Sequence, residues 1–250
     1  KGGRTMSVVV EPELTFVCFK WKRITTGVQL PNVIDYSARH VNTLRNMLER
    51  HVRIPHRLVC VTDQADYIDS RIEVIPLWDH CRYLGGCYNR LWVFSEEARE
   101  YFGDRFCCID LDCVLVNDCT SIFDRPEDFV INTYNPMIYN EFSPRFKGMD
   151  QHYNGGLFMM NAGCRASVWG EFDYETVPPL MIEDQRVVGS DQAWIRYHLG
   201  KREARWGNAE GVFEARQVGR HLPPEAKLVM FAGKRDPSTF PYQWVRGHWQ

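Results

Sequence analysis

Apolar runs and helical repeats alternate along the first half of the chain. Short apolar runs bounded by polar or turn residues predict buried strands, and apolar positions spaced three and four apart predict helices. The strands expected here are residues 14–19 (LTFVCF), 57–62 (RLVCVT), 71–77 (RIEVIPL) and 106–116 (FCCIDLDCVLV). The helices expected here are residues 35–51, with Asp35 as N-cap, and residues 91–102, which end before Gly103.

The second half continues with short strands and one clear helix. We expect strands at residues 129–134, 157–160 and 228–231, and a helix at 190–199 with Ser190 as its cap. Strands that alternate with helices predict βαβ units, so the fold class is α/β with a mainly parallel central sheet flanked by helices and a mixed extension after residue 128. Ligands of such sheets bind beyond the carboxyl ends of the strands.

Composition places the chain among ordinary globular proteins. It has 250 residues, 44% hydrophobic and 25% charged, with a net charge of −2, which excludes a disordered chain. We expect one domain at residues 6–250 and set residues 1–5 (KGGRT) aside as a cloning remnant or a trimmed start. Nine cysteines without C-x-x-C spacing predict buried reduced thiols and a cytoplasmic location. No segment approaches the ~18 apolar residues of a membrane span, so we expect no integral membrane association.

Charge is unevenly distributed. Residues 196–250 hold ten basic residues against five acidic ones, a net charge of +5, which leaves −7 for residues 1–195. This asymmetry is typical either of an anionic ligand near residues 196–250 or of a solvated basic face.

Two carboxylates, Asp110 and Asp112, interrupt the apolar run at 106–116. Alternate residues of a strand share a face, so both are expected to point the same way. Buried carboxylates are costly unless a cation compensates them, and a hard divalent cation that also binds phosphate does so. The alternative is an ion-paired or solvated strand end. Haloacid-dehalogenase-like phosphatases carry a similar aspartate pair, but on their first strand and with glycine at the position of Cys113.

Downstream segments favour another family. The segments that carry the resemblance stand in order as FVCFKWK, YSARHVNTLRNML, PHRLVCVTD, YNRLWVF, RFCCIDLDCVLVNDCTSIF, YNGGLFMMNAG, GSDQAWI and KLVMFAGKRDP. Over about nine-tenths of its length the chain resembles GT-A glycosyltransferases, close to the family-8-like bacterial and phage group with a DxD motif. The resemblance implies a nucleotide-sugar-binding half at residues 6–118 and an acceptor and catalytic half at 119–250.

The resemblance also implies an activity and a set of site residues. It implies a hexosyltransferase that uses a nucleotide-sugar, a UDP-sugar first of all, with Mn²⁺ or Mg²⁺ on Asp110 and Asp112 and with retention of configuration favoured. The catalytic residues that it implies are Asp191, Gln192 and Asn154. The nucleotide-sugar-binding residues that it implies are Phe19, Lys20, Trp21, Asp63, Arg90, Asp110, Gly155, Gly156, Gly233, Lys234 and Arg235.

Structural alternatives stay open for several of these residues. Lys20 is equally compatible with a surface charge, and Arg90 with an exposed position on a helix. Gly155 and Gly156 also suit a tight turn, and Asp191 suits the cap of the helix that follows.

One departure from the family concerns the metal. The family places a histidine, its third metal ligand, before a late glycine, whereas this chain reads VMFAGKRDP with Met230 and Ala232 at the candidate positions. Water or another residue can complete the shell, and Lys234 with Arg235 can bind the diphosphate directly. A non-catalytic nucleotide-sugar-binding relative is therefore an alternative, as is a phosphatase that needs Asp110.

The acceptor is open between two classes. One is a saccharide or lipid-linked sugar, and the other is hydroxymethylated DNA of the phage type. Aromatic residues in the basic C-terminal third would suit DNA by base stacking. These are Trp206, Phe213, Trp244 and Trp249. The sequence indicates no oligomeric state.

Overall fold

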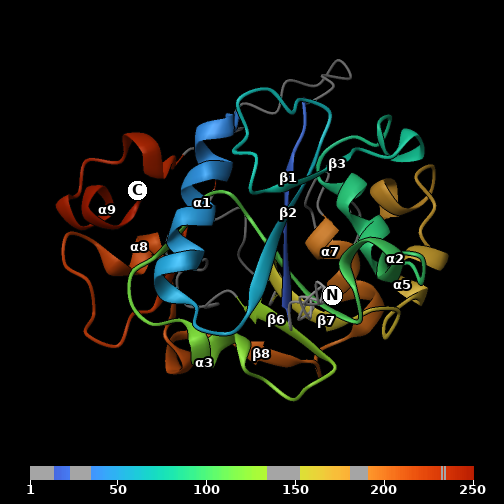
Figure 1. Ribbon diagram of the computed structural model, residues 1–250. Coiled ribbons are helices and arrows are strands. Elements are labelled where there is room, and N and C mark those ends of the chain that lie inside the picture. The colour runs from blue at the N-terminus through green and yellow to red at the C-terminus, as the bar shows by residue number, and fades with distance from the viewer. Residues whose placement is uncertain (1–13, 23–34, 134–152, 181–190, 232, 234) are drawn as a thin grey trace, which may run out of the picture.

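A seven-stranded sheet forms the centre of the computed structural model, which describes residues 14–22, 35–133, 153–180, 191–231, 233 and 235–250 (Figure 1). The strand order is β3-β2-β1-β4-β7-β6-β8. The strands are β1 (Leu14–Lys20), β2 (His56–Thr62), β3 (Glu73–Pro76), β4 (Arg105–Ile109), β6 (Phe129–Thr133), β7 (Tyr153–Asn161) and β8 (Ala204–Trp206). Strand β7 runs antiparallel to β4 and β6, and the other neighbouring pairs are parallel. The predicted mainly parallel α/β sheet is confirmed.

A smaller sheet joins distant parts of the chain. Its order is β5 (Cys113–Leu115), β10 (Leu228–Met230) and β9 (Val212–Glu214). Met230 lies opposite Cys113 on one side and Glu214 on the other. Strand β5 follows β4 after only three residues, so the chain passes from the large sheet to the small one at Asp110–Asp112.

Helices cover both faces of the large sheet (Figure 1). One core cluster joins this sheet to α1 (Ala38–His51), the small sheet, α8 (Ala215–Val218) and α9 (Gln243–His248). The other joins it to the 3₁₀ helix η2 (Tyr88–Phe94), α2 (Ala98–Phe102), α5 (Ser167–Gly170) and α7 (Asp191–Leu199). The remaining short helices are η1 (Asp79–Cys81), α3 (Thr120–Phe123), η4 (Asn208–Glu210) and η5 (Pro237–Thr239).

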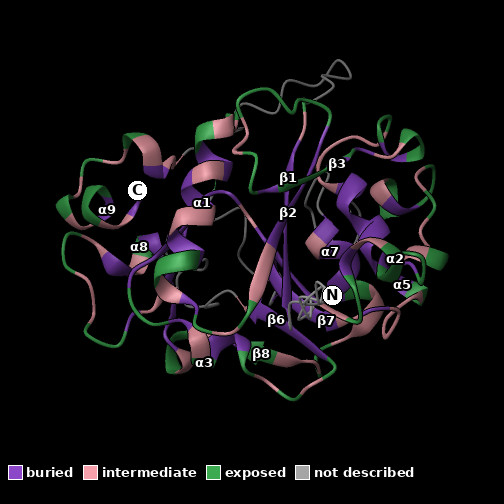
Figure 2. Cartoon of the chain, in the orientation of Figure 1, coloured by how far each residue is buried: buried purple, intermediate pink, exposed green. Residues whose placement is uncertain are grey.

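Strand β1 contributes to both clusters. Phe16 and Cys18 face the α1 side, whereas Val17 and Phe19 face the η2 side. Figure 2 shows the central strands buried between the two layers. Burial on both faces explains why β1 reads as a continuous apolar run rather than an alternating one.

Three sequence predictions about elements are wrong. Residues 106–116 form two strands in two sheets, so Asp110 and Asp112 lie in the connection and not in one strand. Residues 91–102 are divided between η2 and α2, with extended backbone at Ser95 (φ −63°, ψ 158°). Apolar spacing continues across both breaks because the flanking pieces are buried, and periodicity alone therefore does not reveal them.

The third correction concerns the start of α1. Its N-cap is Ser37 rather than Asp35. The backbone N–H of Ser37 donates to Nδ1 of His40 at 3.2 Å, which closes the first turn. Ser190, the expected cap of α7, and Tyr134, the expected end of β6, lie outside the described residues.

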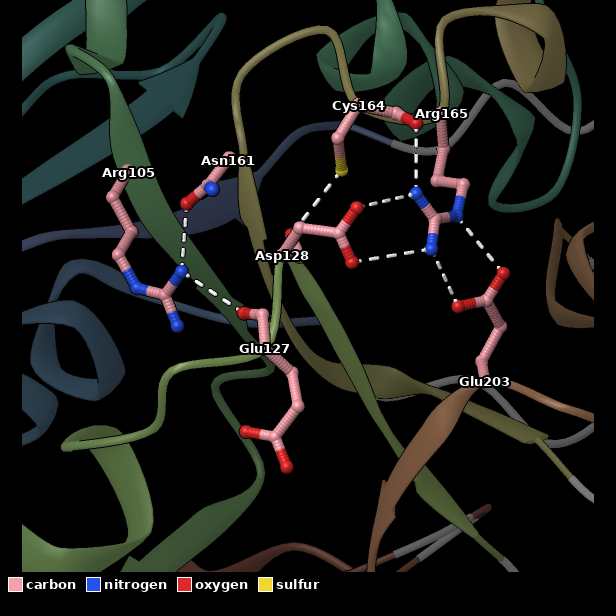
Figure 3. A network of polar contacts seen from close by, with 7 residues as sticks. All are labelled: Arg105, Glu127, Asp128, Asn161, Cys164, Arg165 and Glu203. Carbon is pink, nitrogen blue, oxygen red and sulfur yellow. Dashed lines mark hydrogen bonds and ion pairs between the residues drawn. The ribbon is translucent and has the colours of Figure 1, made fainter.

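The large sheet has two edges of different character. At the edge where β4, β6 and β8 begin, Arg165 Nη1 lies 2.9 Å from Asp128 Oδ2 and its Nη2 lies 2.8 Å from Glu203 Oε2 (Figure 3). Arg105 Nη1 donates to Asn161 Oδ1 at 2.6 Å nearby. The carboxyl ends of β1, β2 and β4 lie at the opposite edge, where the site is expected.

The structure also bears on the expectations about the cysteines and about membrane spans. All nine cysteines are free, and seven of them are buried, in agreement with the thiol prediction. Among the helices described, none is long and apolar enough to cross a membrane. The predicted division of the domain at residues 118 and 119 stays a prediction.

Candidate functional site

The Asp110–Asp112 connection is held between the two sheets. The N–H of Asp110 donates to the carbonyl of Gly156 in β7 at 2.8 Å. On the other side, the N–H of Phe231 just after β10 donates to the carbonyl of Asp112 at 2.9 Å. The aspartate pair is therefore positioned by backbone bonds to segments 45 or more residues away, which makes this connection a rigid part of the carboxyl edge.

Arg90 links two carboxylates that are far apart in sequence. Its Nη1 donates to Asp110 Oδ1 at 2.5 Å, and its Nε donates to Asp191 Oδ2. The side chains of Arg90 and Asp191 are only 8% and 3% exposed. Burial lowers the pKa of Arg90, but the charges of Asp110 and Asp191 outweigh burial and raise this pKa well above its usual value. The alternative of an exposed helix-surface arginine is wrong.

Gly155 and Gly156 allow these side chains to approach the backbone of β7. A Cβ on Gly155 would lie 2.9 Å from Asp191 Oδ2, and one on Gly156 would lie 2.6 Å from Asp110 Oδ2. Neither contact is compatible with any other residue unless the carboxylates move. Both glycines lie in the extended strand β7, so the tight-turn alternative is wrong.

Asn154 and Gln192 are fixed by the same two glycines. The N–H of Gly156 donates to Asn154 Oδ1 at 2.8 Å, and the N–H of Gly155 donates to Gln192 Oε1 at 3.2 Å. The three residues predicted to be catalytic, Asn154, Asp191 and Gln192, thus come together from β7 and the start of α7. Their roles stay a prediction.

Asp112 is buried with one unsatisfied oxygen. The residue is 6% exposed, and its Oδ1 has no hydrogen-bond partner among the described residues. Burial, followed by the nearby charge of Asp110, raises the pKa of the Asp112 carboxyl well above its usual range, although a hydrogen bond from the Tyr36 hydroxyl opposes the shift. A buried carboxylate in this state needs a cation or a proton.

The donor set of Asp110 and Asp112 fits a hard divalent cation. Carboxylate oxygens are the ligands that Mn²⁺ and Mg²⁺ prefer, and the unpaired Oδ1 of Asp112 is available for one. Within the described ranges, no group of three or more His, Cys, Asp or Glu residues gathers to complete a shell. The two aspartates therefore fit the ion, but the structure assigns them no third protein ligand.

Met230 occupies the space where a third ligand would be sought. Its Cε lies 3.0 Å from the position of a Cβ on Gly156, next to Asp110 Oδ2. A thioether is a soft ligand and binds hard cations poorly. Ala232 and Lys234 lie outside the described residues.

The segment that follows lies beside α1. Gly233 adopts a left-handed φ of 71°. Just beyond Arg235, Asp236 Oδ1 accepts from His40 Nε2 of α1 at 3.1 Å. The contacts of Gly233 and Arg235 with a diphosphate stay predictions.

The exits of β1 and β2 lie side by side. Lys20 Nζ donates to the backbone carbonyl of Gln64 at 2.8 Å and to Gln64 Oε1 at 3.3 Å. The N–H of Lys22 donates to Asp63 Oδ1 at 3.0 Å. Lys20 is 6% exposed, so the surface-charge alternative is wrong. The predicted group of Phe19, Lys20, Trp21 and Asp63 does gather here, although Phe19 itself belongs to the core.

Two neighbours of these residues were not predicted from the sequence. Gln64 directly follows Asp63 at a strand end, and this position is a signal that could have identified it. Tyr36 precedes a helix without any pattern that points to Asp112, so only the tertiary structure identifies it.

Most of the aromatic residues considered for DNA stacking are core residues. Trp206, Phe213 and Trp249 are buried, and Trp244 packs partly buried against the same cluster. The indole N–H groups of Trp206 and Trp244 donate to the carbonyls of Ile122 and Gly219. The expectation that these rings form a stacking surface is wrong, because apolar rings near the C-terminus serve to attach it to the core.

Comparison with known proteins identifies the fold. No protein-family model matches the chain, and no curated protein matches it significantly. Among solved structures, the galactosyltransferase LgtC in complex with donor and acceptor sugar analogs is 14% identical with a TM-score of 0.56, over 89% of this chain and 88% of that one. An active-site mutant of LgtC is 14% identical with a TM-score of 0.58, over 93% of each chain. The glycosyltransferase GlyE of Streptococcus pneumoniae is 12% identical with a TM-score of 0.55, over 95% of this chain and 60% of that one. The central sheet and its flanking helices therefore have the GT-A fold of these structures.

Proposed function

We propose that the chain is a cytoplasmic glycosyltransferase of the hexosyltransferase type. It transfers a sugar from a nucleotide-sugar to an acceptor with the help of Mn²⁺ or Mg²⁺. A UDP-sugar is the favoured donor. The observation that carries the proposal is the convergence of Arg90, Asp110, Asp191 and Gln192 on Gly155 and Gly156 at the carboxyl edge of the sheet. The likeness to LgtC, whose structure holds donor and acceptor sugar analogs, supports it.

Asp110 and Asp112 are the residues that would hold the divalent ion. When bound, such an ion acts as a Lewis acid that neutralises charge on the leaving diphosphate. Arg90 holds Asp110 and Asp191 in place through its ion pairs. Asp112 Oδ1, which has no hydrogen-bond partner in the described part of the chain, offers a further carboxylate oxygen.

Asp191 and Gln192 are the proposed residues at the reacting carbon. The transfer breaks the bond between the anomeric carbon and the diphosphate oxygen and forms a bond to an acceptor oxygen. The hydroxyl proton of the acceptor passes to Asp191 or to the leaving diphosphate. Gln192, oriented by the N–H of Gly155, and Asn154 position the sugar beside Gly155. Retention of configuration is the favoured stereochemistry.

A saccharide or a lipid-linked sugar is the proposed acceptor, and hydroxymethylated DNA is the second candidate. The burial of Trp206, Phe213 and Trp249 removes the stacking argument for DNA, which leaves the basic C-terminal charge as its support. Salt separates the two, since binding to DNA weakens steeply with ionic strength because counterions are released.

The first test is a thermal-melt panel of UDP, GDP and UDP-sugars, each with Mn²⁺ or with chelator. A ligand at about 100 times its dissociation constant adds about 2.7 kcal/mol, or about 5–10 °C for a domain of this size. We expect a metal-dependent shift with one nucleotide. The absence of any shift would contradict the proposal and favour an Asp110-dependent phosphatase, to be assayed on an aryl phosphate.

Turnover separates the enzyme from a non-catalytic relative. We expect Gln192→Ala to lower kcat about 100-fold with a change in donor affinity below about threefold, because its proposed contacts form at the reacting carbon. Donor binding without hydrolysis or transfer in the unchanged protein would instead support the non-catalytic alternative that Met230 raises.

A further inference from the structure

Lys20 is a buried cation with no counter-ion among the described residues. It is the last residue of β1 and is 6% exposed. Its Nζ donates to the backbone carbonyl and the Oε1 of Gln64, which are both neutral oxygens. Within the part of the chain that the structure describes, Lys20 forms no ion pair. A buried charge satisfied by neutral groups alone is costly, and such a charge is expected where a ligand of opposite sign binds.

Arg90 is also a buried cation at this edge, but its charge is compensated. Its guanidinium is ion-paired to both Asp110 and Asp191. Together with Asp112 these residues carry three negative charges and one positive charge when ionised. A divalent ion balances this group and leaves no positive charge for the phosphates of a donor. The phosphates therefore need a cation outside the group.

Lys20 ends the strand next to the one that leads into the aspartate pair. Strands β1 and β4 are parallel, with Val17 opposite Cys108. Strand β1 ends at Lys20, and β4 ends at Ile109, directly before Asp110. Lys20 and the Asp110–Asp112 connection are thus found at the carboxyl ends of two adjacent parallel strands.

Lys20 and Arg90 approach this edge from opposite faces of the sheet. Alternation along β1 puts Lys20 on the face of Phe16 and Cys18, which is the α1 face. Arg90 belongs to η2 on the other face, and Figure 1 shows the two layers on either side of the strands. Asp112 is on the α1 side too, because its carboxylate accepts from Tyr36, directly before that helix.

We propose that the Lys20 ammonium binds a phosphate oxygen of the donor diphosphate, with Gln64 holding the side chain in place. Arg90 does not contact the phosphates and instead positions Asp110 and Asp191. The proposal rests on the proposed function, since it requires a nucleoside diphosphate at this edge. It assigns the phosphate-binding charge to the first strand of the fold rather than to the helix before the aspartate pair.

The test compares nucleoside diphosphates with their nucleosides. Calorimetry with Mn²⁺ is carried out with ADP, CDP, GDP and UDP and with the parent nucleosides. We expect Lys20→Met to weaken the preferred diphosphate by about 10- to 100-fold, because a charge-assisted hydrogen bond is lost. Binding of the matching nucleoside should change less than about twofold, since it has no phosphate.

Lys22→Met is the matched control. Lys22 is exposed two residues further along, and its contact to Asp63 is made by the backbone. The variant loses the same formal charge without losing the buried ammonium. We expect its diphosphate affinity to stay within about twofold of the parent protein, as for exposed charges in general.

Gln64→Glu tests the same charge without removing the lysine. The substitution places a carboxylate where Oε1 now lies 3.3 Å from Nζ, and this carboxylate competes with phosphate. We expect a higher melting temperature without ligand and a diphosphate affinity lowered by about tenfold. This variant decides the question if Lys20→Met does not fold.

The outcomes separate the two proposals. If the parent protein binds no nucleoside diphosphate, both the proposed function and the role of Lys20 are wrong. If the parent protein binds one and Lys20→Met or Gln64→Glu binds it equally well, only the role of Lys20 is wrong. An equal loss of nucleoside and diphosphate binding in Lys20→Met would show that the residue supports the base and not the phosphates.

Discussion

The two edges of the central sheet differ in how far their charged side chains are paired. At the edge where β4, β6 and β8 begin, Arg165 binds Asp128 and Glu203 (Figure 3), and its hydrogen bond holds the pKa of Asp128 below the usual range. At the carboxyl edge, burial and Asp110 raise the pKa of Asp112. The charges at the first edge are paired within the protein. At the second edge, Asp112 Oδ1 and the Lys20 ammonium have no partner of opposite charge in the described ranges.

This difference fits the proposal that the carboxyl edge binds a ligand, whereas the ion pairs of the other edge stabilise the fold. An uncompensated buried charge costs stability, and it persists where a bound partner compensates it. Strands β4 and β6 run between the two edges. The same strands therefore connect the ion-paired edge with the candidate site.

Asp112→Asn removes the uncompensated carboxylate and is expected to have the largest effect. Metal-dependent nucleotide affinity should fall by about 100-fold or more, since one of two oxygen-ligand residues is lost. Without metal, the variant should be more stable than the parent protein at neutral pH by about 1–3 kcal/mol. Calorimetry and denaturant unfolding measure the two effects.

The pH dependence of this stability difference has a definite sign. A raised pKa means that folded Asp112 keeps its proton to a higher pH than it does in the unfolded chain. Its favourable contribution is present below its ordinary pKa of about 4 and is lost as the pH rises through the raised value. The advantage of Asp112→Asn should therefore vanish below about pH 4. An Asp112→Asn protein that is less stable at pH 7 would contradict this account.

Gly156→Ala tests how closely the carboxyl edge is packed. The new Cβ would lie 2.6 Å from Asp110 Oδ2, so the carboxylate has to move. We expect donor affinity to fall by about 10- to 100-fold and stability to fall by about 1–3 kcal/mol. Gly170→Ala is the control, because a Cβ there meets no atom within 4 Å, and it should leave both quantities nearly unchanged.

Arg165→Met tests the other edge. Loss of the guanidinium leaves Glu203, whose side chain is 14% exposed, without its ion pair. We expect the free energy of unfolding at pH 7 to fall by about 2 kcal/mol and nucleotide affinity to stay unchanged. Arg53→Met, which removes an exposed pair with Asp118, should cost below about 0.5 kcal/mol. A loss of nucleotide binding in Arg165→Met would mean that the two edges are coupled.

Met230→His tests whether a third protein ligand can be added to the proposed metal site. The imidazole would stand beside Asp110 and Gly156, so we expect Mn²⁺ affinity to rise by about tenfold. Nucleotide affinity in the presence of chelator should not change. Unaltered Mn²⁺ affinity in a folded Met230→His protein would show that the side chain at this position does not reach the ion.

Much of the architecture could be predicted from periodicity. The runs that form β1 and β2 and the repeat that forms most of α1 were predicted, because long buried elements carry a strong pattern. Only residues 157–160 of β7 were predicted, because Asn154, Gly155 and Gly156 interrupt the apolar run. The division of residues 106–116 between two sheets was missed, since an apolar run does not record which neighbour each half pairs with. The carboxylates were found because charge in such a run is rare.

The sequence alone determined which chemical groups are present at the carboxyl edge: the aspartate pair, the adjacent glycines, and polar residues at the strand ends. Only the tertiary structure decided which charges compensate one another. Arg90 pairs with Asp191 across 101 residues, while Lys20 donates to neutral oxygens of Gln64 and has no ion pair among the described residues. Charge compensation depends on distance and burial, and both are set by packing between segments that are remote in sequence.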